Sequence, residues 1–114
     1  MRRGSILDIL FVFYGGTMRE NEYQAKLIKK IKQAIPGCTV LKNDPNYLQG
    51  IPDLTVLYKD KWALLEVKAE EGAPSQPNQE YYIEHFSNDT FATFVYPENE
   101  KEVLLGIQQA FGLA

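Results

Sequence analysis

The sequence predicts a single small α/β domain in which helices flank a mixed four-stranded sheet. Three observations predict this class. The chain has 114 residues, which is enough for one hydrophobic core but too short for several domains. Its apolar residues recur at helical spacing in some segments and in short extended runs in others. These segments follow one another in the order α-β-β-β-α-β-α, which is typical of a small sheet flanked by helices.

The first elements are a helix, a strand and a loop. A helix over residues 18–35 is predicted because apolar residues recur three and four positions apart, and Pro36 and Gly37 end it. A strand over residues 38–42 leads into residues 43–52, which are rich in turn-forming residues and are predicted to form a loop.

The later elements begin with two strands joined by a tight turn. Lys59 and Asp60 separate two apolar runs, as expected for a two-residue hairpin connection. Pro77 suits the first position of a helix. In chain order, the predicted elements are strands over 53–58 and 61–68, a helix from Pro77 to about Phe86, a strand over 91–96 and a helix over 98–111.

Residues 1–17 differ from the rest of the chain. They begin with two arginines and contain an apolar run, Ile6 to Tyr14, that one aspartate interrupts. The run is too short to span a bilayer, and it lacks the features of a signal peptide, so we expect no membrane segment here. We interpret residues 1–17 as an extension that forms an extra strand or a short amphipathic helix. The alternative is that Met18 is the true start, because codons for the preceding glycine pair can resemble a ribosome-binding site.

Composition and charge exclude several kinds of site. A single cysteine excludes an intrachain disulfide and a cysteine-based zinc site, and a single histidine excludes sites that need two. The formal net charge of −3 argues against binding nucleic acid through bulk charge alone. The charge is uneven, however. Residues 18–35 hold five basic and two acidic side chains, whereas residues 72–114 hold one basic and six acidic side chains.

Two carboxylates are predicted to meet at one end of the hairpin. With Lys59 and Asp60 as the turn, Asp53 lies directly opposite Glu66. Opposed residues have Cβ atoms about 5 Å apart, so two carboxylates there can share one hard cation. Lys68 leaves its strand on the same face as Glu66, because side chains alternate along a strand. The alternative is that Asp53 caps a loop, while Glu66 and Lys68 end a strand in solvent.

The hairpin strands are apolar on both faces, so we expect both faces to be covered. One face carries Leu54, Val56, Ala63, Leu65 and Val67, and the other carries Leu57, Trp62 and Leu64. A carboxylate pair buried in such a sheet is costly unless a metal or a proton neutralises it. The aromatic residues expected in the core, rather than as a platform for nucleobases, are Trp62, Tyr81, Tyr82 and Tyr96.

Polar residues also occur on the predicted buried faces of two helices. At 100° per residue, Glu20 and Gln24 lie on the apolar face of the first helix, where an acid and an amide need polar partners. Gln79 shares the apolar face of the second helix, near its start. The competing interpretation of Glu20 is a capping box with Thr17.

These residues together resemble a known nuclease motif. Residues 49–53, Gln-Gly-Ile-Pro-Asp, followed after a strand pair by Glu-Val-Lys at residues 66–68, resemble the PD-(D/E)XK motif. With Glu20, Gln24 and the Gln-Pro-Asn-Gln stretch at residues 76–79, the chain resembles the virus-type replication-repair nuclease (VRR-NUC) family, particularly its small stand-alone phage or prophage members. The resemblance extends from residue 18 to about residue 111.

The resemblance implies a restriction-endonuclease-like domain over residues 18–114 that hydrolyses DNA phosphodiester bonds with Mg²⁺ or Mn²⁺. In such an enzyme Asp53, Glu66 and the Val67 carbonyl would bind the metal, an all-oxygen set suited to a hard cation. Glu20 would hold a second metal or a metal-bound water.

The resemblance also assigns roles around the metal. Lys68 would position the attacking water or help to deprotonate it, and Gln79 would orient Lys68 or a phosphate oxygen. Gln49 and Gly50 would let their loop approach the DNA backbone closely. The residues expected on the substrate side are Gln24, Lys42, Gln49 and Gly50.

The implied partner is DNA, branched as in a Holliday junction. Because resolving a four-way junction requires two symmetric cuts, a homodimer is expected. The resemblance implies a phage- or prophage-encoded protein in the bacterial cytoplasm that uses no small-molecule cofactor. The sequence leaves two alternatives open: a nuclease with less selectivity for DNA structure, and a nuclease fold that serves as a DNA-binding or interaction module.

Overall fold

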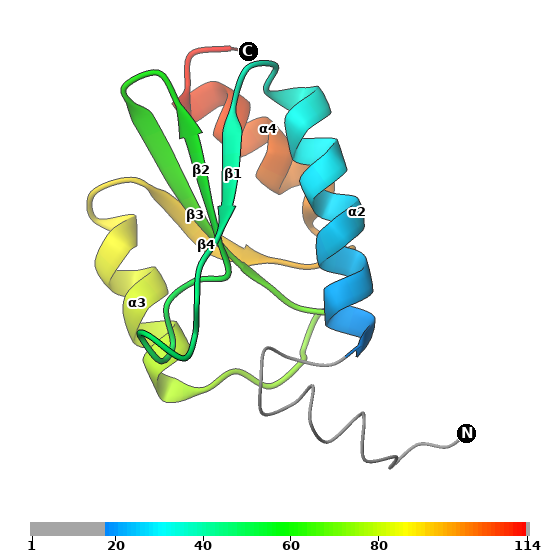
Figure 1. Cartoon of the computed structure of the whole chain (residues 1–114), viewed down its shortest axis with the longest axis vertical. Coiled ribbons are helices and arrows are strands. Elements are labelled where there is room, and N and C mark those ends of the chain that lie inside the picture. Colours follow the sequence, from blue (N-terminus) through cyan, green and yellow to red (C-terminus); the bar gives the residue numbers. More distant parts are fainter. Residues whose placement is uncertain (1–17, 114) are drawn as a thin grey trace.

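The computed structural model describes residues 18–113 and contains three helices and four strands there (Figure 1). In chain order these elements are α2 (Met18–Ala34), β1 (Thr39–Lys42), β2 (Leu54–Tyr58), β3 (Lys61–Val67), α3 (Pro77–Ser87), β4 (Phe91–Val95) and α4 (Glu100–Ala110). The predicted element order is confirmed. The expectations for residues 1–17, including the Thr17 cap, lie outside the described residues.

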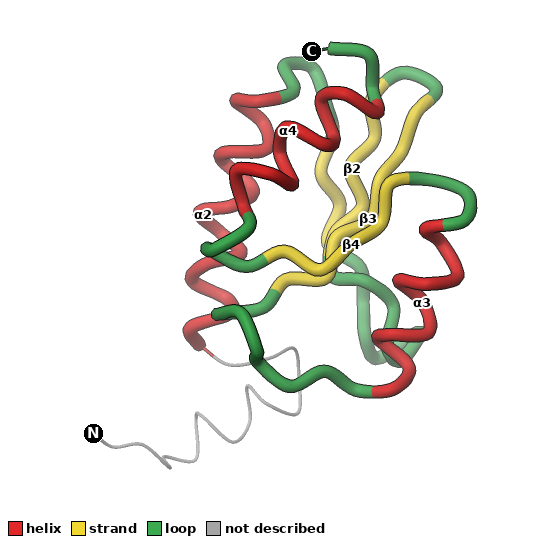
Figure 2. The backbone as a smooth tube through the Cα atoms, turned by 180° about the vertical axis from the view of Figure 1, so that it is seen from behind, coloured by secondary structure: helices red, strands yellow, loops and turns green. Residues whose placement is uncertain are grey.

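The four strands form one sheet in the order β1-β2-β3-β4. β2 pairs antiparallel with both β1 and β3, whereas β3 and β4 are parallel. A parallel pair requires a crossover connection, and the segment that contains α3 provides it. Figure 2 shows α2 and α4 on one side of the sheet and α3 on the other. The mixed α/β fold with a flanked four-stranded sheet is therefore confirmed.

Local sequence explains where the helices begin and end. α2 stops before Pro36 and Gly37, and Gly37 adopts a φ of 92°, which favours glycine. α3 begins at Pro77, and its backbone start is stabilised by the side chain of Gln79, which accepts a hydrogen bond from the Gln76 N–H at 2.9 Å. Within the described part of the chain, none of the helices is both long and apolar enough to cross a bilayer.

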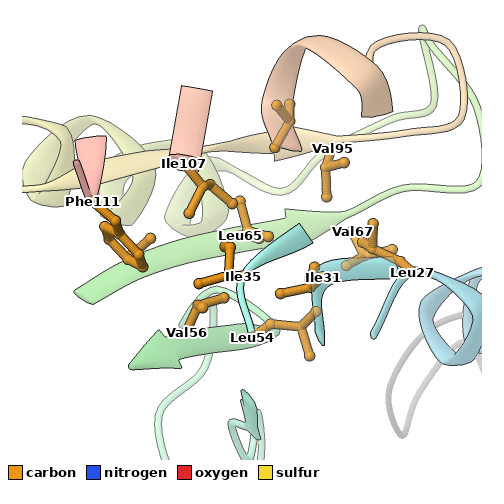
Figure 3. Close-up of a cluster of buried hydrophobic side chains, with 12 residues drawn as sticks. Leu27, Ile31, Ile35, Leu54, Val56, Leu65, Val67, Val95, Ile107 and Phe111 are labelled. Atoms are coloured by element: carbon orange, nitrogen blue, oxygen red, sulfur yellow. The ribbon is translucent and has the colours of Figure 1, made fainter. Parts of the chain in front are cut away.

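The hydrophobic core lies between the sheet and the helix pair α2 and α4 (Figure 3). α2 contributes Leu27, Ile31 and Ile35, each fully buried at the helical spacing seen in the sequence. The remaining members are Leu54, Val56, Ala63, Leu65, Val67, Val95, Val103, Ile107 and Phe111. One face of the hairpin is thus buried as predicted.

The expectation that both sheet faces are covered is only partly right. α3 packs chiefly over β3 and β4, where Leu64 is 5% exposed. Leu57 on β2 and Trp62 at the start of β3 remain 39% and 37% exposed. α3 packs over β3 and β4 and leaves Leu57 uncovered, and it reaches Trp62 through one edge-on ring contact with Phe86 near its C-terminal end. Tyr81 was also expected in the core and is 59% exposed, since it projects from the outer side of α3.

Candidate active site and metal centre

The hairpin register brings the two predicted carboxylates together. The turn pairs Tyr58 with Lys61, and the pairing continues to Leu54 opposite Leu65. One step further along this register, Asp53 and Glu66 face each other across the strand ends. The structure also shows how Asp53 is held: its Oδ2 accepts a hydrogen bond from the Val67 N–H at 2.8 Å.

A glutamine side chain joins the lysine to the second carboxylate. Lys68 Nζ donates to Gln79 Oε1 at 2.9 Å, and Gln79 Nε2 donates to Glu66 Oε2 at 2.9 Å. Lys68 Nζ also donates to the Pro74 carbonyl at 3.2 Å and lies 3.8 Å from Glu66 Oε2. Because an amide has both an acceptor and a donor, Gln79 can hold a cation and an anion at once.

The site is buried, which disfavours ionised carboxylates. Glu66 is 2% exposed and Lys68 is 6% exposed. Burial raises the pKa of Asp53 to about 6, although the hydrogen bond from the Val67 N–H lowers it. Burial, together with the nearby charge of Asp53, raises the pKa of Glu66 to about 9. Without a cation, this pair therefore retains a proton at neutral pH.

The first turn of α2 brings another acid close to the pair. Glu20 is half-buried there, and its negative charge contributes to raising the pKa of both Asp53 and Glu66. Gln24, one helical turn later, is also half-buried. The helix thus places Glu20 near the strand ends, as the helical spacing predicted, and adds negative charge to the site.

The donor set fits a hard divalent cation. Oε1 of Glu66 is buried, and it has no hydrogen-bond partner within the described part of the chain. A buried, ionised oxygen without a donor is costly, and either a proton or a cation removes this cost. Among residues 18–113, no three acidic, histidine or cysteine side chains cluster tightly enough to form a metal site alone. A cation held by Asp53 and Glu66 would therefore need backbone and water oxygens, which Mg²⁺ commonly retains.

Comparison with known proteins identifies the fold. No family model matches the chain, and no curated protein matches it. A solved structure described as a VRR-NUC domain shares 26% sequence identity and a TM-score of 0.61, covering 79% of this chain and 95% of that one. A second, described as a VRR-NUC domain protein, shares 17% identity and a TM-score of 0.60, covering 85% and 91%. The chain has the VRR-NUC fold. This fold indicates a nuclease-type domain.

In this VRR-NUC fold, the predicted substrate-side residues on β1 and in the loop before Asp53 differ in their exposure to solvent. Lys42, at the end of the edge strand β1, and Gln49 are exposed. Gly50 is buried with a φ of 90°, and a Cβ there would lie 2.6 Å from the Asn78 side chain. The structure thus supplies a packing reason for this glycine, and its predicted contact with DNA remains a prediction.

Two residues that support the candidate site were missed from the sequence. The Asn43 side chain donates to the Pro52 carbonyl at 2.8 Å and to Thr55 Oγ1 at 2.9 Å, which closes the loop before Asp53. The Pro74 carbonyl accepts from Lys68. An asparagine among turn-forming residues and a generic backbone carbonyl carry no sequence signal for these roles.

Proposed function

We propose that this chain is a Mg²⁺- or Mn²⁺-dependent endonuclease that hydrolyses DNA phosphodiester bonds and prefers branched DNA. The observation that carries the proposal is the buried set of Asp53, Glu66 and Lys68 joined through Gln79, with one carboxylate oxygen lacking a donor. A purely structural module gains nothing from burying two acids, since an apolar pair of similar size is usually at least as stable. The VRR-NUC fold of the chain supports the same assignment.

Asp53 and Glu66, with the Val67 carbonyl, would hold the metal, and Glu20 would hold a second metal or a metal-bound water. The bound ion would polarise the phosphate and lower the pKa of a bound water. The positive charge of the ion would stabilise the ionised forms of Asp53 and Glu66. It would thereby offset the cost that burial places on these charged forms.

Lys68 would contact the substrate directly. Its ammonium group has three protons, and two are donated to Pro74 and Gln79 within the described chain. The third can be donated to a phosphate oxygen or to the attacking water. Gln79 fixes the direction of this group, because it is itself held by Glu66 and by the start of α3. The amino group is therefore positioned before substrate binds.

The test is cleavage of a fluorescent four-way junction and of a linear duplex, each with Mg²⁺ and with EDTA. We expect Mg²⁺-dependent cleavage that is faster on the junction, and loss of cleavage in Asp53→Ala and Lys68→Ala. Asp53→Asn, which keeps an acceptor for the Val67 N–H, separates loss of charge from loss of structure. Asp60→Ala, in the exposed hairpin turn, is the matched control that retains activity.

Three outcomes would contradict the proposal in different parts. Cleavage that survives in both Asp53→Ala and Lys68→Ala would refute the assigned site. Equal rates on junction and duplex would refute branch selectivity while leaving a nuclease. Absence of Mg²⁺-dependent cleavage by a folded wild-type chain would refute the enzyme. The expected homodimer is measured separately by sedimentation of the chain with and without the junction.

A further inference from the structure

An exposed aromatic side chain lies at the tip of the loop that precedes Asp53. This β1–β2 loop comprises residues 43–53 and runs beside α3 in both views (Figures 1 and 2). Tyr47 is 90% exposed and the adjacent Leu48 is 39% exposed. An aromatic ring in water forgoes the favourable burial that most such side chains reach, and a binding partner that covered the ring would supply it.

The loop that presents Tyr47 is held by its own hydrogen bonds. The backbone N–H groups of Tyr47 and Leu48 both donate to the Asp44 carbonyl, at 3.2 and 3.3 Å. The Asp44 carboxylate accepts from the Asn46 N–H at 2.8 Å, and the Ile51 N–H donates to the Leu48 carbonyl at 3.2 Å. A partner that contacts the ring therefore meets a preorganised surface and does not have to order the loop.

The same loop is attached to the proposed active site. The Asn43 N–H donates to the Asp53 backbone carbonyl at 2.8 Å, so the two ends of the loop meet at the residue that carries the proposed catalytic carboxylate. Gly50 packs against Asn78 at the start of α3, in the helix that also carries Gln79. A group bound at the loop tip is thus placed in a defined relation to the bond that would be cut.

The chemistry of the loop favours a flat, uncharged ring over a phosphate. Residues 43–53 contain no lysine or arginine, and their two charged side chains, Asp44 and Asp53, are both acidic. Acidic groups repel the DNA backbone, whereas the face of a tyrosine can stack on any nucleobase. Inside a continuous duplex both faces of each base are already stacked. Free faces occur where stacking is interrupted, at branches and strand ends.

We propose, resting on the proposed nuclease function, that Tyr47 stacks on a nucleobase left without a stacking partner at a DNA branch and so selects branched over continuous DNA. Leu48 supports the ring by contacting the edge of the same base. Tyr47 is thereby a specificity-determining residue, because it selects which DNA is held while Asp53, Glu66 and Lys68 act at the phosphate.

The test measures binding by the full chain in EDTA, so that cleavage does not interfere. The probes are a forked duplex with the fluorescent base 2-aminopurine at its first unpaired position, and a continuous duplex of equal length. Wild type should bind the fork more tightly and change its fluorescence. Tyr47→Ala should weaken fork binding by about five- to hundredfold and leave duplex binding unchanged, since one stacked base is lost.

Two further variants make the result specific. Tyr47→Trp should restore fork binding, because it supplies another stacking ring. Tyr81→Ala, which removes a 59% exposed tyrosine from α3, should bind the fork like wild type. Both Tyr47 variants should keep the wild-type melting temperature, since that position is 90% exposed. Tyr81→Ala loses ring contacts with Tyr82 and His85, so a cooperative thermal melt is required to show that it is folded.

The proposal would be overturned if Tyr47→Ala bound the fork as tightly as wild type, or if it lost affinity equally for the fork and the duplex. It would also be overturned if wild type showed no preference for the fork, which includes the case in which it binds neither probe. The nuclease is judged separately. Cleavage without any effect of Tyr47 would refute stacking alone. A Tyr47 effect on binding, without Mg²⁺-dependent cleavage, would refute the nuclease alone.

Discussion

Replacing Glu66 by glutamine should stabilise the protein when no divalent cation is present. The carboxyl is 2% exposed, its Oε1 has no hydrogen-bond partner within the described chain, and burial raises its pKa to about 9. A glutamine has nearly the same shape and carries no charge at any pH. It also keeps an oxygen that can accept from Gln79 Nε2, as Glu66 Oε2 does.

The magnitude follows from the difference between the folded and unfolded states. The pKa of Glu66 rises from its usual 4.5 to about 9, so at pH 7 the folded protein keeps a proton that the unfolded chain has lost. At pH 7, about 2.5 units above the unfolded pKa, this protonation lowers the free energy of unfolding by about 3 kcal/mol. Glu66→Gln should therefore gain about 1–3 kcal/mol, or roughly 5–15 °C in Tm, the lower figure applying if the new amide finds no acceptor.

The pH dependence has a definite sign. Below pH 4.5 the carboxyl is protonated in both states, so the two proteins should differ little. As the pH rises toward 9, wild type loses stability relative to Glu66→Gln, because its folded pKa lies above its unfolded pKa. Thermal melts at pH 4.5, 7 and 8 in EDTA measure this difference. Glu84→Gln, an exposed change on α3, is the matched control and should follow wild type.

Adding Mg²⁺ should reverse the order of stability. Wild type should melt at a higher temperature with Mg²⁺, since the ion binds the folded state, and Glu66→Gln should respond little. The reasoning would be refuted if Glu66→Gln melted no higher than wild type at pH 8 in EDTA. A metal response of equal size in both proteins would refute Glu66 as a ligand.

Two further predictions concern the residues around the site. Gln79→Leu should lower the cleavage rate about 10–100-fold while DNA binding changes little, because Lys68 loses the oxygen that orients it. Single-turnover kinetics and DNA-binding assays measure the two effects separately. An unchanged cleavage rate would count against the positioning role of Gln79. Gly50→Ala should lower the free energy of unfolding by more than about 2 kcal/mol, since the new Cβ adds a clash with the Asn78 side chain to the backbone strain of a φ of 90°. Gly72 has a φ of 83° and open space around it, so Gly72→Ala should lower the free energy of unfolding only by the backbone strain. If urea melts gave the same loss of stability for Gly50→Ala and Gly72→Ala, the clash with Asn78 would be contradicted.

Local sequence patterns predicted much of the fold and part of the site. The spacing of Leu27 and Ile31 predicted the buried face of α2, and the structure confirms it. The two-residue turn at Lys59 and Asp60 was enough to set the hairpin register, and with it the opposition of two acids. Such features depend on neighbours a few residues apart or on a turn whose geometry sets a whole strand pair, so the sequence contains the information.

The sequence by itself determined the elements, their order and the pairing that brings Asp53 opposite Glu66. Only the tertiary structure decided that one Gln79 amide bridges Lys68 and Glu66, that the Pro74 carbonyl is the second acceptor of the lysine, and that part of the outer sheet face stays exposed. These features depend on where α3 and its preceding loop settle on the sheet. That position results from many weak packing contacts between distant segments, which a local pattern in the sequence does not specify.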